Sequence, residues 1–303
     1  MFTNKTGLVI PTRNRPTELY STLQFFLKKK IKFLKILIID SSNKNLKKEI
    51  INICNRFGAH LYFSEPSTSK QRNIGLRKFI NEKLEFIMFL DDDLRFYENS
   101  FRIMNSYIGK YQKKYAGFSF NNIKLAKQSL LEKIKLSSYI KKIGLYSSNQ
   151  GEILNNGWQT KIINLKKNLE SQWMSTQCVI FRKEYITDKY FDESFGVYSY
   201  LEDLDFSLQI NPERNRLFLV VADAKYVHSK EIIRTSLTFG YYEFINRYKI
   251  IKKFNLKNYS FFFMVFCKTC LTFFSIFINY KNIFKVMGNI KGIFFIIFFR
   301  FKR

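Results

Sequence analysis

The chain has 303 residues, of which 18% are aromatic, and its formal net charge at pH 7 is +27. This length allows one large α/β domain with an appendage, or two small domains, and four cysteines are too few for a disulfide framework. The charge favours anionic partners such as phospholipid, nucleic acid or phosphorylated substrates, and composition alone does not choose among them.

The first hundred residues alternate short apolar runs with helical patterns. A helix is expected to open at Pro16, because proline is well tolerated in the first turn of a helix. Strands separated by helices predict a parallel sheet with right-handed connections. The predicted strands are residues 8–10, 36–39, 60–63 and 86–90, and further helices are expected over 46–57 and 69–81.

Three consecutive aspartates, Asp91, Asp92 and Asp93, follow the apolar run of the fourth predicted strand. Carboxylates crowded at the end of a buried strand repel one another and lose hydration, so a divalent cation or several donors best stabilises them. Magnesium or manganese suits this site better than zinc, because no Cys or His lies near the run in sequence. A solvated acidic turn is the alternative interpretation.

Other polar clusters follow the predicted strands, at the edge of a parallel sheet where ligands bind. These clusters are Pro11-Thr12-Arg13-Asn14, Asp40-Ser41 and residues 69–73. The chain has neither a Walker A loop nor a G-x-G-x-x-G motif, so the sequence does not support a P-loop nucleotidase or a dinucleotide oxidoreductase.

The second half begins with a helix expected over residues 101–114 and a strand over 117–120, followed by a polar, lysine-rich region. A strand is expected over 177–181. Glu202 and Asp203 then head an amphipathic helical stretch. Acidic residues in a first turn often only complement the helix dipole, which is the structural alternative to a catalytic role.

Residues after 256 have a different character, being rich in phenylalanine and basic side chains. No run reaches the roughly 18 to 20 uninterrupted apolar residues of a clear membrane span, so we expect interfacial helices with snorkelling lysines. A buried helical subdomain is the alternative. The predicted organisation is a catalytic domain over 1–255 and a membrane-associating helical tail over 256–303. Cys267 and Cys270 have C-x-x-C spacing without a second Cys or His pair, so no metal or redox role is expected.

Taken in order, the motifs resemble the family 2 glycosyltransferases, inverting enzymes of the GT-A fold. The resemblance runs over residues 8–228, with a continuation to 254. The motifs that carry it are residues 9–14, 38–40, 71–75, 89–93, 173–182, 191–193 and 202–203.

The resemblance implies an α/β fold of the GT-A type, with a mostly parallel central sheet flanked by helices. It implies transfer of a hexose from a nucleotide-diphosphate donor, a UDP- or dTDP-sugar, with Mn²⁺ or Mg²⁺ as cofactor. The acceptor would be a glycan, either lipid-linked or part of a surface polysaccharide or lipooligosaccharide. The N-terminus lacks a secretory signal pattern, and we expect a peripheral enzyme on an anionic membrane surface, at the cytoplasmic face of the inner membrane, with no nucleic-acid partner.

The resemblance also implies roles for single residues. Thr12 and Asp40, together with Pro11 and Arg13, would contact the nucleotide, Asp40 accepting a hydrogen bond from a pyrimidine N–H. Arg72 and Asn73 would lie along the nucleotide and help to place the donor.

Four further positions complete the donor side of this pattern. Asp93 would bind the metal directly, while Asp91 or Asp92 would hold the ribose or a metal-bound water, and Asp91 is a second candidate ligand. Trp173 would lie near the donor sugar and the acceptor.

For the chemistry, the resemblance implies Asp203 as the general base that takes the proton of the acceptor hydroxyl, with Glu202 orienting the acceptor or the base. A divalent ion would stabilise the negative charge on the departing diphosphate. His228 would be a further metal or diphosphate ligand, or else a structural residue.

Two departures from the family pattern are present. Ser41 and Ser42 stand where a second acidic residue often follows the position of Asp40, and Trp173 to Gln177 replaces a segment that commonly carries a small residue. Three alternatives stay open: a nucleic-acid-binding module, an inactive GT-A-like membrane scaffold, and a nucleotidyltransferase. The last usually has a glycine-rich, lysine-bearing N-terminal loop, which this chain lacks.

Overall fold

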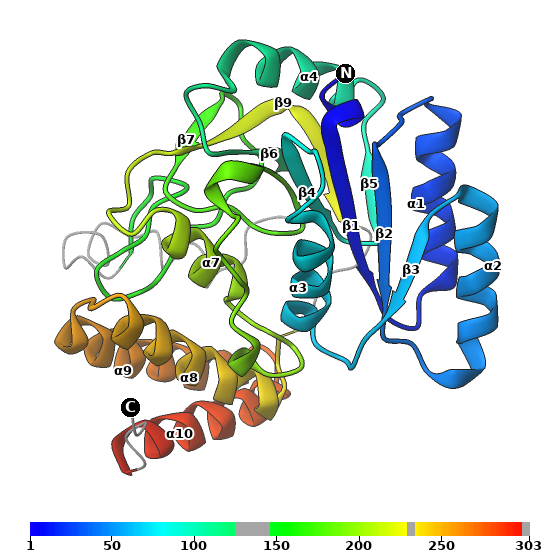
Figure 1. The fold of residues 1–303 in the computed structure, drawn as a ribbon. Helices are drawn as coiled ribbons and strands as arrows, with labels where there is room; N and C mark the ends of the chain where they lie inside the picture. The colour runs from blue at the N-terminus through cyan, green and yellow to red at the C-terminus, as the bar shows by residue number, and fades with distance from the viewer. Residues whose placement is uncertain (125–145, 229–233, 299–303) are drawn as a thin grey trace. The chain divides into compact units, whose positions relative to one another are not determined.

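The computed structural model describes residues 1–124, 146–228 and 234–298 of the chain (Figure 1). The contacts divide the chain into two compact units. The N-terminal unit comprises residues 1–124 and 162–230, and the C-terminal unit comprises 125–161 and 231–303. The domain boundary expected near residue 255 stays a prediction.

The N-terminal unit is built on one mixed sheet with the strand order β3-β2-β1-β4-β8-β6-β9-β5, and β7 pairs with β9 beside this path. Its strands are β1 (Thr6–Thr12), β2 (Lys35–Asp40), β3 (His60–Phe63), β4 (Phe86–Leu90), β5 (Leu94–Phe96), β6 (Gly117–Asn122), β7 (Leu169–Ser171), β8 (Cys178–Arg182) and β9 (Phe218–His228). The helices of this unit are α1 (Pro16–Lys28), α2 (Lys47–Phe57), α3 (Thr68–Phe79), α4 (Ser100–Tyr111) and α7 (Glu202–Ile210).

Alternate residues of the buried strands point to two separate hydrophobic layers. On β1, Leu8 belongs to one buried cluster with residues of α1, α2 and α4, whereas its neighbour Val9 belongs to a second cluster with residues of α3 and α7. This period of two is the expected pattern for a strand with both faces covered. Gly75 lets α3 approach the sheet closely, because a Cβ there would lie 2.5 Å from Cγ1 of Val9.

Most of the predicted elements are confirmed. The four N-terminal strands pair in parallel, α1 begins at Pro16, and α4 and β6 fall where they are expected. The sheet becomes mixed beyond β4, because β8 pairs antiparallel with both β4 and β6. The short strands β5 and β7 were not predicted, since three residues each give too little periodicity. Part of the lysine-rich middle region lies outside the described residues.

The register of the short strand β5 positions two distant segments of the chain. β5 directly follows the three aspartates and pairs antiparallel with the end of β9, so that Leu94 lies opposite His228. Because Asp93 precedes Leu94, this pairing brings the end of β9 to the aspartates. The carboxyl ends of β1 and β2 open at the same edge, since Thr12 pairs with Asp40 in the parallel ladder.

The described part of the C-terminal unit contains α8 (Leu237–Lys253), α9 (Asn258–Phe274) and α10 (Asn282–Phe298). Its core includes Trp158, Phe244, Tyr248 and Phe261. The helices expected after residue 256 are therefore present. The expectation of a snorkelling lysine is wrong at Lys268, because its ammonium lies 2.9 Å from Oε1 of the buried Glu243. By length and apolar composition, the stretch Asn258–Phe277 could cross a membrane.

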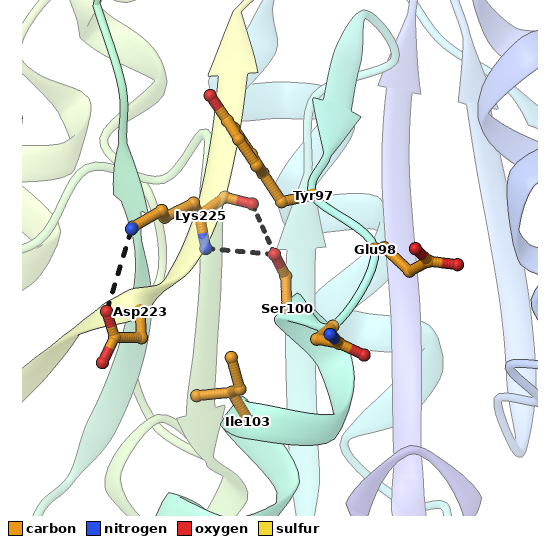
Figure 2. A pocket seen from close by; sticks show the side chains of 7 residues that line it. Tyr97, Glu98, Ser100, Ile103, Asp223 and Lys225 are labelled. Atoms are coloured by element: carbon orange, nitrogen blue, oxygen red, sulfur yellow. Dashed lines mark hydrogen bonds and ion pairs between the residues drawn. The ribbon is translucent and has the colours of Figure 1, made fainter.

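A surface hollow of about 470 Å³ lies in the N-terminal unit beside the connection between β5 and α4 (Figure 2). Ser100 connects its two sides, since its Oγ donates to the carbonyl of Lys225 and accepts from the amide of the same residue. None of the predicted site residues lines this hollow, so it is distinct from the candidate site.

Candidate active site

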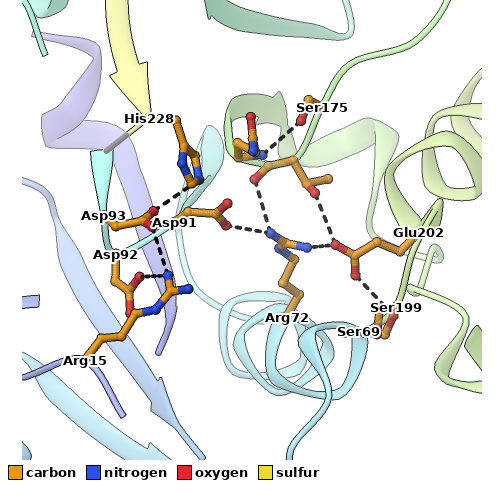
Figure 3. A network of polar contacts seen from close by, with 12 residues as sticks. Arg15, Ser69, Arg72, Asp91, Asp92, Asp93, Ser175, Ser199, Glu202 and His228 are labelled. Carbon is orange, nitrogen blue, oxygen red and sulfur yellow. Dashed lines mark hydrogen bonds and ion pairs between the residues drawn. The ribbon is translucent and has the colours of Figure 1, made fainter. Parts of the chain in front are cut away.

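The three aspartates have different partners, although they are adjacent in sequence (Figure 3). Side chains of the same unit already make hydrogen bonds to Asp92. Its carboxylate accepts hydrogen bonds from Thr12 at 2.7 Å and Arg15 at 3.1 Å, and its carbonyl accepts one from Thr22. Burial raises the pKa of Asp92 to about 7, against the opposing effects of the Thr12 hydrogen bond and the Arg15 charge. The predicted substrate contact at Asp92 therefore has competing structural partners.

Asp93 lies between a cation and an imidazole. Its Oδ2 accepts a hydrogen bond from Arg15 at 3.0 Å, and its Oδ1 lies 3.3 Å from Nε2 of His228. Within the described part of the chain, this buried Oδ1 makes no hydrogen bond. A buried carboxylate oxygen without a donor is costly, and such atoms often mark a site for a ligand.

Asp91 is the most accessible of the three, with about a quarter of its side chain exposed. It accepts a hydrogen bond from Nη2 of Arg72 at 2.9 Å. Burial raises the pKa of the Asp91 carboxyl, while the charges of Arg72, His228 and Arg15 oppose that shift.

Arg72 links the aspartates to the head of α7. This side chain of α3 is almost fully buried, and it forms ion pairs with both Asp91 and Glu202. Burial lowers the pKa of Arg72, and the charges of Asp91 and Asp203 oppose this. Since its partners come from separate segments, Arg72 fixes the spacing between the two acidic clusters.

Glu202 and Asp203 occupy different environments at the start of α7. Glu202 is buried and also accepts hydrogen bonds from Ser69 at 3.1 Å and Thr176 at 3.3 Å. Asp203 is more exposed than Glu202, and its Oδ1 accepts the amide hydrogen of Leu204. The structure thus holds Glu202 as a bracing group and presents Asp203 toward the surface.

The turn that leads into α7 has a strained backbone. Ser199 and Leu201 have φ values of 48° and 74°, a region that non-glycine residues rarely adopt. The turn is held in place because Oγ of Ser199 accepts a hydrogen bond from the amide of Ser69. The position of the Glu202-Asp203 pair is therefore set by contacts with α3.

Asp40 lies at the end of β2 on the other side of the aspartates. It is fully buried, and the amide of Ser42 donates to its Oδ1 at 3.0 Å. Among the described residues, its Oδ2 has no hydrogen-bond partner. Ser42 also accepts a hydrogen bond from the amide of Asn14, which has a φ of 55°, so the loops after β1 and β2 are joined.

The other residues predicted to contact substrate differ in how deeply they are buried. Asn73 is buried, and its amide group bonds the backbone of Phe191 in both directions, at 2.9 and 2.8 Å. Trp173 is also buried, and its carbonyl accepts a hydrogen bond from Ser171. Pro11 is buried in β1, whereas Arg13 is exposed. Asn73 therefore braces the loop at Phe191, and its contact with substrate stays a prediction.

Arg15 is the site residue that the sequence motifs missed. It is the N-cap of α1, where the helix dipole disfavours a cation, and it bonds both Asp92 and Asp93. A basic residue at such a position, just before Pro16, indicates an acidic partner elsewhere in the chain. This feature of the sequence could have predicted that Arg15 has an acidic partner, but not which acidic residue the partner is.

The side chains near Asp93 can be compared with those that usually bind a divalent cation. The described residues contain no group of three or more His, Cys, Asp or Glu side chains arranged to hold a metal ion. Asp93 and His228 form a pair, with a buried oxygen of Asp93 that lacks a hydrogen-bond donor. One carboxylate and one imidazole fit Mn²⁺ or Mg²⁺, which commonly take their remaining ligands from water and substrate phosphates.

The mixed sheet between helical layers, with acidic clusters at the carboxyl ends of its strands, defines a fold of the GT-A type. The family model of Glycosyl transferase family 2 matches residues 8–187. The chain therefore belongs to glycosyl transferase family 2, and the expected fold and enzyme class are confirmed at the level of the family.

Solved structures give a similar result for the fold. TarS of S. aureus, residues 1–349 in complex with UDP-GlcNAc, has a TM-score of 0.51 and 15% identity, covering 82% of this chain and 65% of that one. Another TarS structure has a TM-score of 0.50 and 16% identity, covering 82% of this chain and 40% of that one. The chain spans less than two thirds of the length of both. A comparison with curated proteins gave no match.

Proposed function

We propose that the protein is an inverting glycosyltransferase that moves a sugar from a nucleotide-diphosphate donor to an acceptor hydroxyl. The observation that carries this proposal is the buried Oδ1 of Asp93, which makes no hydrogen bond in the described part of the chain and faces Nε2 of His228 at 3.3 Å. This arrangement suits a cation that is shared with the donor phosphates.

Asp93 and His228 would hold Mn²⁺ or Mg²⁺, and the partly exposed Asp91 would contribute through a water or the donor ribose. When bound, such an ion stabilises the negative charge of the departing nucleoside diphosphate as a Lewis acid. Arg15 contacts both Asp92 and Asp93, so it neutralises part of this acidic cluster and holds the two carboxylates in place.

Asp203 would act as the general base. An acceptor hydroxyl has a pKa far above neutrality, so its proton must leave as the oxygen attacks the anomeric carbon. Asp203 is the more accessible acid at the head of α7, whereas Glu202 is engaged by Arg72, Ser69 and Thr176. Glu202 is therefore proposed as a positioning residue, and attack opposite the leaving group inverts the anomeric configuration.

Asp40 would select the base of the donor. Its buried Oδ2 lacks a hydrogen-bond donor among the described residues, and Thr12 is its partner in the β1–β2 ladder. Uracil and thymine each offer an N3–H group to such an acceptor, whereas cytosine has no hydrogen there. This supports a UDP- or dTDP-sugar donor, and UDP-GlcNAc is the ligand named for one structural neighbour.

The proposed acceptor is a lipid-linked or surface-polysaccharide glycan, and the proposed location is the cytoplasmic face of the inner membrane. The C-terminal sequence supports this location, because its apolar stretches are interrupted by basic residues and no acidic residue occurs after Glu243. Anionic headgroups attract such segments by about 1 kcal/mol for each well-placed basic residue.

Calorimetric titration with UDP, dTDP, GDP and CDP, with and without Mn²⁺, tests the proposal. We expect metal-dependent binding of UDP or dTDP, and loss of that preference in Asp40→Asn, which keeps the size of the side chain but adds an N–H donor. Glu65→Gln, an exposed change outside the network, is the matched control.

The other outcomes separate the alternatives. Failure of all four nucleotides to bind would contradict the proposal and favour an inactive scaffold. Steeply salt-dependent binding to oligonucleotides would instead favour the nucleic-acid-binding alternative.

A further inference from the structure

The C-terminal unit exposes two long apolar stripes. On α9, large side chains with about half of their surface accessible recur on one side, and α10 carries a similar set. Members on α9 include Phe262, Phe263, Phe266 and Phe273, and members on α10 include Phe284, Met287, Ile290 and Phe294. Their spacing of three, four and seven residues places each set on one face of its helix. Apolar surface of this extent indicates an interaction site.

The opposite sides of these helices are packed inside the unit. Phe261 of α9 lies 5.6 Å from the ring of Tyr248 on α8, measured between centroids. α10 approaches α8 more closely, because a Cβ on Gly288 would lie 2.1 Å from the carbonyl oxygen of Leu237. Gly292 lies four residues further along α10, against the carbonyl of Tyr241. This small-xxx-small spacing allows helix backbones to pack in close contact.

One buried acid ties the three helices together. The carboxylate of Glu243 on α8 lies 2.9 Å from the ammonium of Lys268 on α9 and 3.1 Å from that of Lys285 on α10. All three side chains are at least four-fifths buried. The two lysines lie on helices whose outer stripes are apolar, so Glu243 holds both ammonium groups on the inner side and offsets part of their charge.

The charge of the surrounding sequence points to the partner. No Asp or Glu occurs after Glu243, whereas basic residues continue to the last residue of the chain, Arg303. A partner that covers phenylalanine stripes beside an excess of basic residues must combine an apolar interior with an anionic surface. An anionic lipid leaflet has this combination, and a second copy of this basic chain does not.

We propose that α9 and α10 lie in the plane of an anionic leaflet, with their outer stripes in the lipid and Glu243 holding Lys268 and Lys285 away from it. This inference deepens the membrane location in the proposed function. In-plane insertion follows from the inner packing, because α8 carries Lys249, Lys252 and Lys253 and is unsuited to the bilayer interior. A spanning α9 would have to leave α8 and expose Lys268 to lipid.

Flotation of the full-length protein with vesicles tests the surface. We expect binding to phosphatidylglycerol-containing vesicles that weakens at least about tenfold in Phe263→Ser/Phe266→Ser, because two exposed aromatic side chains lose their apolar burial. Phe63→Ser, at an exposed phenylalanine of the N-terminal unit, is the matched control and should bind like the unaltered protein. Unchanged binding by the double variant would overturn the proposal, as would dimerisation without lipid that protects the stripes.

Glu243→Gln tests the role of the buried acid. It should weaken vesicle binding about tenfold or more, because Lys268 and Lys285 lose the buried carboxylate that holds them on the inner side of α9 and α10, away from the apolar stripes. Asp223→Asn removes a negative charge from an exposed ion pair of the N-terminal unit and is the control for net charge. Unchanged binding by Glu243→Gln would refute this role. Retained UDP binding by both variants in detergent would show that the N-terminal unit is folded, and would separate a failure here from a failure of the proposed chemistry.

Nitroxide labels distinguish lying on the membrane from spanning it. Labels on Tyr259→Cys, Phe266→Cys and Phe273→Cys, in a chain with Cys267→Ser and Cys270→Ser, report depth along α9. In-plane insertion predicts the same shallow depth at the three positions. A steady change in depth from Tyr259 to Phe273 would show a spanning helix and overturn the proposal.

Discussion

Nε2 of His228, at the end of β9, lies 3.3 Å from Oδ1 of Asp93, which follows β4. The pairing of β5 with β9 produces this contact, because Leu94 lies opposite His228 in the antiparallel ladder. The two residues that we propose as metal ligands thus come from segments that are far apart in sequence, and the sheet register brings them together.

Asp93→Asn should remove the metal dependence of nucleotide binding. Loss of a residue that supports a metal ligand typically lowers the affinity for the metal by roughly 10- to 100-fold. Loss of a direct ligand should lower it at least as much. Calorimetry with UDP would then give equal affinities with and without Mn²⁺. Asp188→Asn alters an exposed acid paired with Lys189 and should leave the metal effect intact. A full metal effect in Asp93→Asn would exclude Asp93 as a ligand.

Asp203→Asn should keep donor binding and lose transfer. Removal of a general base typically lowers the rate by roughly 10²- to 10⁴-fold, and the amide keeps the size of the side chain. The measurements are the affinity for UDP and single-turnover transfer from the donor that the titration identifies. Transfer at the unaltered rate would refute the assignment of Asp203 as the base.

Glu202→Gln should mainly reduce stability, because the buried Arg72 would lose one of its two anionic partners. Breaking a buried ion pair by removing one partner costs about 3–5 kcal/mol of stability. The amide oxygen of the glutamine can still accept hydrogen bonds, so we expect a loss near the lower end of this range. Urea unfolding measures this loss. The control is Glu184→Gln, which breaks an exposed pair with Arg182 and should cost about 0–1 kcal/mol. Equal stabilities of the two variants would contradict the bracing role.

Cys54 should make the stability of the protein depend on pH in the alkaline range. Burial, with a smaller effect of the Asp40 charge, raises the pKa of the Cys54 thiol from 9.0 to about 12. Between these values the unfolded chain releases the thiol proton and the folded protein retains it, so the free energy of unfolding falls as pH rises. The loss is about 1.4 kcal/mol for each pH unit above 9.

Urea unfolding at pH 8 and pH 10 measures this contribution when the protein is compared with Cys54→Ala. The variant lacks the titrating thiol, so its stability should fall less over the same interval. An identical fall in both proteins would show that the thiol ionises equally easily in the folded state. Rapid alkylation of Cys54 in the native protein at pH 8 would also contradict the prediction, because the thiolate is the reactive form.

The sequence predicted the elements with strong local signals and missed those that depend on long-range pairing. The N-terminal strands were recognisable because each is a run of apolar residues bounded by polar turns, and Pro16 marked the start of α1. The antiparallel entry of β8 between β4 and β6 has no local signal, because an apolar strand fits either direction.

The same division applies to the candidate site. The acidic clusters were visible as motifs, but the bridge from Arg72 to Asp91 and Glu202 is a property of the folded chain. Lys268 shows the limit most clearly: its sequence neighbours are apolar, and its partner Glu243 lies on another helix. Local composition predicted snorkelling because it could not supply that partner.

The contact of α8 with α10 also bears on which substitutions the chain can accept. Gly240, Gly288 and Gly292 each lie against backbone atoms of the facing helix, which cannot rotate aside as a side chain can. The outer stripes meet no such restriction, so phenylalanine, isoleucine, leucine and methionine should exchange freely there. Among relatives of this chain, the C-terminal unit should therefore vary most on its outer surface and least at the three glycines where α8 and α10 meet.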